Sequence, residues 1–240
     1  MLSIIIPTLN EEKLIASVLD QFTPELKKDF PFEIIISDGG SVDRTLHIAA
    51  EYDVAMLRHT ERRRQTIAEG RNRGANTATS DVLVFLNADT RFGDTRKFLS
   101  EVHRVMRDDH ILAATCSVQV FPEEEKLIDR VFHVCHNAYC RLLNLIGEGM
   151  GRGECQIIRK ELFDRIGKYN EELAAGEDYD LFRRVRRIGK IAFLKNVTLY
   201  ESPRRFRKYG YMHIVWGWTK NALSVAWKKK SSSEVWEAIR

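Results

Sequence analysis

Three short, unbroken runs of mainly β-branched and aromatic residues constrain the fold more than any other feature of the sequence. The runs are residues 2–6, 33–37 and 81–86, with a weaker one at 54–57. Because polar residues do not alternate with apolar ones within them, the runs are typical of strands buried on both faces of a parallel sheet. Amphipathic stretches of helical length separate them, at residues 11–22, 43–51 and 63–78. This alternation predicts a right-handed, doubly wound α/β unit.

The second half of the sequence is less regular. We predict helices at residues 94–107, 124–146, 160–166 and 179–188, and strands at residues 111–120, 154–159, 191–194 and 197–200. The composition does not change until about residue 203. The sequence therefore predicts one α/β domain over residues 1–202, followed by a helical tail over residues 203–240.

The composition sets bounds on the class of protein. With 44% hydrophobic and 30% charged residues in 240, the chain is typical of a soluble globular protein. The four cysteines include no C-x-x-C pair, which argues against a disulfide framework or a zinc finger and favours a reducing compartment. The start lacks the basic region of a signal peptide, and no run approaches the ~20 apolar residues of a spanning helix. We therefore expect a cytoplasmic protein.

The formal net charge of +4 hides an uneven distribution. Residues 201–240 carry nine Lys or Arg, three Glu and all four tryptophans. Trp favours membrane interfaces, and each basic residue near an anionic leaflet contributes about 1 kcal/mol. We interpret the tail as an interfacial amphipathic helix, which would place the protein at the inner face of the plasma membrane. The alternative is packing on its own domain or on a homodimer partner. Nucleic-acid binding is not expected, because no recognised module accompanies the basic residues.

Polar residues follow the predicted strands at the edge where such sheets bind ligands. The segments are 7–12 after the first strand, 38–43 after the second and 87–90 after the fourth. Asp38 stands where an aspartate commonly accepts hydrogen bonds from a ribose or a base, and Asp89 suits a hard divalent cation. Helix capping is the plainer interpretation of Asp89. No glycine-rich dinucleotide fingerprint follows the first strand, and the sequence contains no P-loop.

A cluster of acids lies at the predicted start of a late helix, in residues 176–181, which read Gly-Glu-Asp-Tyr-Asp-Leu. Acids in a first helical turn are favoured by the helix dipole, so the cluster has a purely structural interpretation. A carboxylate at this position is also suited to act as a general base.

Together these segments resemble the family 2 glycosyltransferases, which are inverting enzymes with the GT-A fold. The matching segments are residues 3–12, 33–45, 70–75, 82–90 and 176–181, in the order and spacing of that family. The resemblance implies a Rossmann-like, mostly parallel sheet flanked by helices. It also implies transfer of a sugar from a nucleotide sugar to a hydroxyl acceptor. From its frequency in the family, UDP is the expected nucleotide.

The resemblance places the donor site on the residues Pro7, Thr8, Glu11, Asp38, Ser41, Arg71, Asn87 and Ala88. Asp38 would bind the base, and Arg71 would lie near the pyrophosphate or the base. Asp89 matches the metal ligand, for Mg²⁺ or Mn²⁺, which stabilises the leaving diphosphate. Asn87 replaces the first acid of the family's D-x-D motif and supplies an amide in place of a charge. Glu201 is the candidate substitute for a later metal-binding His of the family, whereas His213 is expected on a helix surface.

Asp178 matches the family's catalytic base, which takes the proton of the acceptor hydroxyl as that oxygen attacks the anomeric carbon. Attack from the face opposite the nucleotide inverts the anomeric configuration in one displacement. Glu177 would orient the acceptor or a neighbouring loop. If the tail binds a membrane, a lipid-linked acceptor or an envelope glycan is expected.

Two alternatives remain open at the level of sequence. A nucleotidyltransferase shares a related core and an acidic metal site, but its glycine-rich, basic loop after the first strand is absent here. A non-catalytic nucleotide-sugar binding protein has no need of a base, so the presence of both Asp89 and Asp178 argues against it.

Overall fold

The computed structural model describes the backbone of residues 1–228 and the side chains of residues 1–222 and 224. The last part of the predicted tail, including Trp236, lies outside the described residues. Within the described part, no helix combines the length and the apolar character that crossing a bilayer requires.

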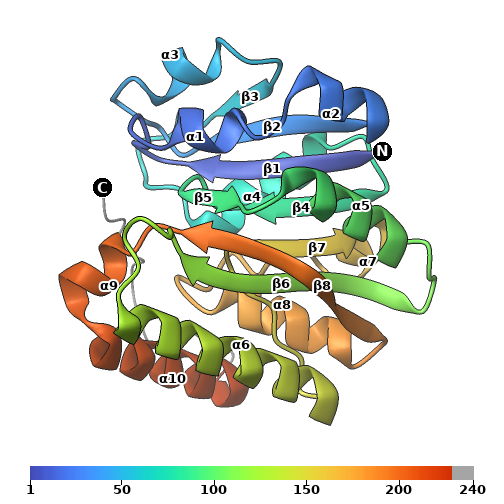
Figure 1. The fold of residues 1–240 in the computed structure, drawn as a ribbon, viewed down its shortest axis with the longest axis vertical. Coiled ribbons are helices and arrows are strands. Elements are labelled where there is room, and N and C mark those ends of the chain that lie inside the picture. Colours follow the sequence, from blue (N-terminus) through green and yellow to red (C-terminus); the bar gives the residue numbers. More distant parts are fainter. Residues whose placement is uncertain (229–240) are drawn as a thin grey trace.

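One mixed sheet of eight strands forms the centre of the molecule, in the order β3-β2-β1-β4-β7-β6-β8-β5 (Figure 1). The strands are β1 (Leu2–Thr8), β2 (Phe32–Asp38), β3 (Ala55–Arg58), β4 (Val82–Leu86), β5 (Thr90–Phe92), β6 (Ile111–Val120), β7 (Cys155–Arg159) and β8 (Lys190–Glu201). Strands β3, β2, β1 and β4 run parallel, and Ile4 lies between Ile34 and Val84 in register. Strand β7 is antiparallel to β4 and β6, β8 is parallel to β6, and β5 is antiparallel to β8.

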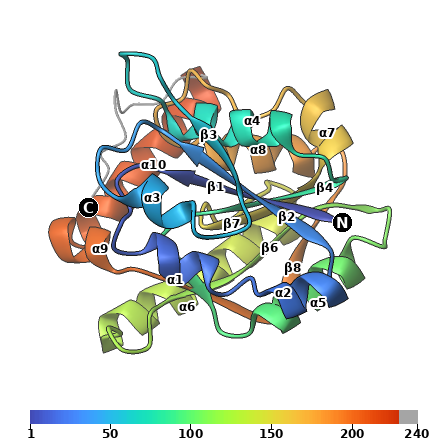
Figure 2. The same ribbon diagram turned by 90° about the horizontal axis from the view of Figure 1, so that it is seen from above.

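Ten helices are described: α1 (Ile15–Leu19), α2 (Pro24–Asp29), α3 (Thr45–Ala49), α4 (Ile67–Thr77), α5 (Thr95–Val105), α6 (Leu127–Ile146), α7 (Lys160–Arg165), α8 (Glu177–Arg186), α9 (Arg204–Tyr209) and α10 (Tyr211–Lys228). Figure 2 shows α1, α2 and α5 on one face of the sheet and α4, α7 and α8 on the other. Helix α6 packs on β6, and α10 lies against α9 and α8. The sheet is therefore covered on both faces, and the two long helices α6 and α10 occupy one end of the molecule (Figure 1).

The unbroken apolar runs are explained by two separate hydrophobic layers. Successive side chains of a strand point to opposite faces. Accordingly, Ile4 and Ile6 pack in one buried cluster with residues of α1 and α5, whereas Ile5 packs in a second cluster with residues of α4, α7 and α8. Helix α4 lies so close to β1 that a Cβ at Gly74 would be 2.4 Å from Ile5 Cγ2.

The predicted elements are confirmed in most places. The expected strands in the first half are β1, β2, β3 and β4, and the strand predicted at 111–120 is β6. The two predicted late strands form a single strand, β8. Its pairing with β6 contains register shifts, and its residue Asn196 has a positive φ of 54°. The helix predicted over residues 11–22 is confirmed only as the short α1. Two further elements, α2 and β5, were not predicted.

Candidate active site

A cavity of about 860 Å³ opens at the carboxyl ends of β1, β2 and β4 and continues between α6 and α10. Most of the residues predicted from the sequence line it, namely Pro7, Thr8, Glu11, Arg71, Asn87, Ala88, Asp89, Glu177 and Asp178. The fold therefore brings together side chains from four separate segments of the chain. Asp38 and Ser41 are not among the residues that line the cavity, although Ser37 and Gly39, on either side of Asp38, are.

Asp38 lies behind the wall and organises the loop after β2. Its carboxylate accepts hydrogen bonds from the backbone N–H groups of Gly40 and Ser41, both at 2.9 Å. It also accepts from the hydroxyls of Thr8, at 3.2 Å, and Ser41. The fully buried carboxylate thus ties the end of β1 to the loop after β2. Its contact with a base stays a prediction.

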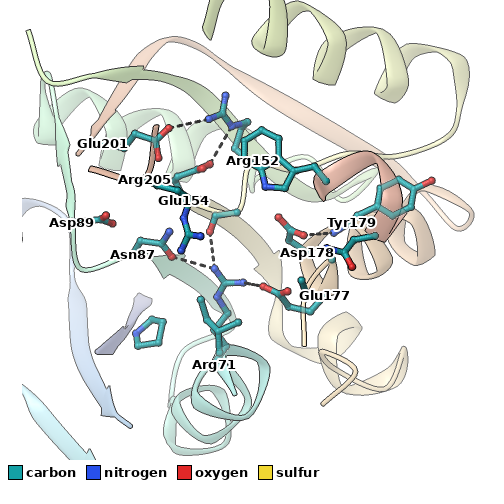
Figure 3. A pocket seen from close by; sticks show the side chains of 18 of the residues that line it. Arg71, Asn87, Asp89, Arg152, Glu154, Glu177, Asp178, Tyr179, Glu201 and Arg205 are labelled. Carbon is teal, nitrogen blue, oxygen red and sulfur yellow. Dashed lines mark hydrogen bonds and ion pairs between the residues drawn. The ribbon is translucent and has the colours of Figure 1, made fainter. Parts of the chain in front are cut away.

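Arg71 joins three segments beneath the cavity (Figure 3). A capping box of Thr66 and Glu69 begins α4 and places Arg71 in the following turn. The guanidinium, only 1% exposed, donates to Glu177 Oε1 at 2.9 Å, to Gly153 O at 2.7 Å and to Asn87 Oδ1 at 3.2 Å. Arg71 therefore holds the loop after β4 and the start of α8 in a fixed relation.

The two adjacent acids at the start of α8 have perturbed ionisation. Burial and the charge of Asp178, against the opposing effect of Arg71, together raise the pKa of Glu177 to about 7. Burial also raises the pKa of Asp178 above its ordinary value. Such groups in a cavity are suited to accept a proton near neutral pH.

The backbone around Asp178 is shaped to hold its carboxylate. Helix α8 begins after Gly176, which has a φ of 86° that favours glycine. Asp178 Oδ1 accepts a hydrogen bond from the Tyr179 N–H at 2.8 Å. A Cβ at Gly153 would lie 2.7 Å from Asp178 Oδ2, so only glycine lets the segment before β7 approach this closely.

A second buried arginine was missed by the sequence analysis. Arg152, 1% exposed, donates from Nε to Glu154 Oε2 at 3.1 Å and from Nη2 to Glu201 Oε1 at 3.4 Å (Figure 3). Although burial opposes ionisation, this ion pair lowers the pKa of Glu154 to about 2. Burial and the charge of Glu154 raise the pKa of Glu201 well above its ordinary value. The only signal in the sequence was the position of Arg152 and Glu154 at the end of a glycine-rich segment.

The first tail helix, α9, also contributes to the cavity. Arg204 donates to both carboxylate oxygens of Glu11, at 3.0 and 2.8 Å, and its Nη2 lies 3.1 Å from Asp89 Oδ2. Arg205 lines the same wall. The boundary predicted at residue 202 therefore falls within the wall of the cavity.

Within the part of the chain that the structure describes, the cavity offers a divalent cation one carboxylate, that of Asp89, rather than a complete set of protein ligands. Among the described residues, no group of three His, Cys, Asp or Glu side chains is arranged to hold a metal ion. Mg²⁺ is commonly held by one or two carboxylates together with substrate phosphates and water, and Asp89 fits that mode. Glu201 lines the cavity too, but its Oε1 faces Arg152 and lies 3.7 Å from His133 Nε2. His213 is exposed on α10, as predicted.

The sequence is similar to a glycosyltransferase family model and to individual glycosyltransferases. A family model described as Glycosyl transferase family 2 matches residues 3–167. A PGL/p-HBAD biosynthesis glycosyltransferase of Mycobacterium bovis is 38% identical over 231 residues, which cover 90% of this chain and 75% of that protein. An uncharacterized glycosyltransferase of Haemophilus influenzae is 29% identical over 198 residues, covering 77% of this chain and 62% of that protein.

Comparison of structures confirms the expected GT-A fold. The mannosyltransferase PcManGT from Pyrobaculum calidifontis, in complex with GDP-Man and Mn²⁺, is similar with a TM-score of 0.71 at 19% identity. The match covers 95% of this chain but only 63% of the mannosyltransferase. Glucosyl-3-phosphoglycerate synthase from Mycobacterium tuberculosis, in complex with Mn²⁺, UDP and phosphoglyceric acid, has a TM-score of 0.63 at 16% identity. That match covers 99% of this chain and 80% of the synthase.

Proposed function

This chain belongs to glycosyl transferase family 2, and we propose that it moves a sugar from a UDP-sugar to a hydroxyl acceptor with inversion at the anomeric carbon. Because the family consists of glycosyltransferases, its match argues against both alternatives, the nucleotidyltransferase and the non-catalytic binding protein. One observation carries the proposal: the carboxylate of Asp178, with its raised pKa, shares a cavity with Asp89 and the strand ends.

The donor would lie along the strand ends. Pro7, Thr8 and Glu11 would surround the nucleotide, with Gly39 and the loop organised by Asp38 beside its base. Asp89 would hold Mg²⁺ or Mn²⁺, and the relatives solved with Mn²⁺ support this choice of ion class. The cation, when bound, neutralises the charge that develops on the leaving diphosphate.

Asp178 would carry the proton transfer. Its carboxylate accepts the proton of the acceptor hydroxyl, while that oxygen forms a bond to the anomeric carbon. The bond from this carbon to the diphosphate oxygen breaks, and the electron pair leaves with the nucleoside diphosphate. Glu177 does not need to touch the substrates, because its ion pair with Arg71 fixes the start of the helix that carries Asp178. Glu177 is therefore proposed as a positioning residue.

The acceptor is proposed to be lipid-linked or an envelope glycan, with the enzyme at the inner face of the plasma membrane. Helix α6 leaves a row of apolar side chains more than half exposed: Leu127, Ile128, Val131, Val134, Leu142, Leu145 and Ile146. Exposed apolar patches of this kind mark membrane or protein contacts, and the exposed Arg130 and Arg141 beside them suit an anionic surface. The name of the M. bovis relative, which concerns PGL/p-HBAD biosynthesis, supports an acceptor of this class.

Three experiments test the proposed function. Nucleotide release from a panel of UDP- and GDP-sugars, with Mn²⁺, with Mg²⁺ and with a chelator, should single out one donor and require a cation. The anomeric proton coupling of the transferred sugar should show inversion; retention of configuration contradicts Asp178 as the base of a single displacement. Flotation with phosphatidylserine-containing and with neutral vesicles tests the membrane contact. A chain that floats with neither and elutes as a dimer supports the homodimer alternative.

A further inference from the structure

The cavity does not end at Asp178. It continues into a groove between α6 and α10, which is lined on α6 by Phe132, Cys135, His136, Tyr139 and Leu143 and on α10 by Val215, Trp218, Thr219, Asn221 and Ala222. None of these side chains is Lys, Arg, Asp or Glu. The remaining wall, which comes from the strand ends and α4, contains Glu11, Arg71 and Asp89. The cavity therefore changes character at the point where the proposed base lies.

Aromatic rings join the two helices at the base of this α6–α10 groove. The centroid of the Trp218 ring lies 5.2 Å from that of His136 and 6.2 Å from that of Phe132. Phe132 also contacts Tyr211 at 4.5 Å and Phe206 at 5.4 Å. Such ring contacts fix the side chains in place, so the apolar lining exists before any ligand arrives.

The one titratable imidazole in the groove is neutral. Burial, aided by the charge of Arg152, lowers the pKa of His136 to about 3. Its Nδ1 is buried and has no hydrogen-bond partner among the described residues. The groove thus combines aromatic and aliphatic side chains with uncharged polar groups of His136, Tyr139, Thr219 and Asn221. Because none of its described side chains from α6 and α10 carries a charge, it suits an aryl or alkyl group and does not suit a phosphate or a carboxylate.

We propose that the α6–α10 groove binds the apolar part of the acceptor, an aryl or alkyl aglycone, and so presents the acceptor hydroxyl to Asp178. The inference rests on the proposed function, since it assigns the acceptor side of the same site. The occupant follows from continuity: a ligand that fills the groove reaches the carboxylate that accepts the proton.

Binding of two probes that differ only in the aglycone tests the proposal. n-Octyl β-D-glucopyranoside, kept below its micelle concentration, and methyl β-D-glucopyranoside are titrated against the full chain by calorimetry. Each methylene that the groove buries should contribute about 0.8 kcal/mol. If two or more methylenes of the octyl chain are buried, the octyl glycoside should bind at least ~10-fold more tightly than the methyl glycoside. Equal affinities for the two probes overturn the proposal.

Two tryptophans on one helix give a matched pair of variants. Trp218 lines the groove, whereas Trp216 is 61% exposed, lies outside it and contacts Lys220. Trp218→Ala should lose most of the octyl preference, by ~5-fold or more, and Trp216→Ala should keep it within ~2-fold. An equal loss in both variants assigns the binding to the exposed face and overturns the groove.

A second groove variant guards against misfolding of Trp218→Ala. Tyr139 lines the groove but is 52% exposed, so Tyr139→Ala leaves the core intact and should still weaken octyl binding by ~3-fold. Hydrolysis of the donor by water, measured in wild type and Trp216→Ala, separates the two claims. Donor hydrolysis without an octyl preference overturns the groove alone, and octyl binding without any donor hydrolysis overturns the proposed function alone.

Discussion

The two halves of the cavity are built by different means. The half at the strand ends is charged and braced by ion pairs, such as Arg204 with Glu11 and Arg71 with Glu177. The half between α6 and α10 contains no charged side chain and is braced by aromatic contacts of Phe132 and Trp218. Charges fixed by a rigid sheet edge suit a diphosphate, whereas a groove between helices suits an apolar ligand.

The difference shows how one site can recognise two dissimilar substrates. Asp178 lies beside both halves: Gly153, before β7, approaches its carboxylate, and α8, which carries it, packs against α10. Changes in one half should therefore leave the other intact, while a change at the meeting point should abolish only the chemistry.

The largest effect is expected at that meeting point. Asp178→Asn removes the proton acceptor without altering the shape of either half, so sugar transfer should fall by ~10²–10⁴-fold. Nucleotide binding, measured by calorimetry, should stay close to that of the wild type. Transfer at the wild-type rate would contradict the assignment of the base.

Removal of a brace in the charged half should cost stability. Arg71→Ala leaves Glu177 buried without its partner, and loss of one member of a buried ion pair costs about 3–5 kcal/mol. Urea unfolding should show this loss. Arg91→Ala breaks an exposed pair with Glu123 and serves as the control, with an expected cost of about 0–1 kcal/mol. Similar costs for the two variants would show that the buried pair does not brace the site.

A moderate effect on donor affinity is expected from α9. Arg204→Ala leaves two carboxylates, Glu11 and Asp89, facing the proposed diphosphate without that cation. A lost charge-assisted hydrogen bond corresponds to a ~10-fold weaker affinity for UDP, measured without added metal. Lys208→Ala, on the exposed side of the same helix, should change the affinity by less than ~2-fold. An unchanged affinity in Arg204→Ala removes α9 from the donor half.

The smallest effect concerns pH. Burial raises the pKa of Glu177 from 4.5 to about 7, so the folded protein binds more protons here than the unfolded chain between these values. The free energy of unfolding contributed by this group therefore falls as pH rises through that range. Glu177→Gln should reduce the loss of stability between pH ~5 and ~7.5 in urea unfolding. An identical slope in variant and wild type would mean that Glu177 is ionised throughout.

Much of the charged half was predictable, because short segments after the strands carry it. The apolar runs placed β1, β2 and β4, and residues that follow each of them, such as Glu11, Gly39 and Asp89, line the cavity. The position of Asp38 behind the wall was not predictable, since it depends on hydrogen bonds within a loop.

The buried ion pairs and the apolar half could not be predicted from the sequence, because they depend on contacts between distant residues. The ion pair of Arg152 with Glu201 joins residues 49 positions apart, so no local pattern signals it. The contacts of α6 with α10 likewise depend on tertiary packing. Strand β5 has three residues, and among the described strands it pairs with β8 alone, which is too little for a periodicity to show.

The location of Arg204 has a consequence for exchanging acceptor specificity between relatives. The sequence predicts one tail over residues 203–240, yet α9 pairs with Glu11 in the half proposed for the nucleotide, and α10 lines the half proposed for the acceptor. A chimera joined at residue 202 would replace both functions together. Gly210, at the turn between the two helices with a φ of 76°, is the natural crossover point. A chimera joined at Gly210 would exchange α10, which lines the proposed acceptor groove, and would keep the ion pairs that Arg204 of α9 makes with Glu11 and Asp89.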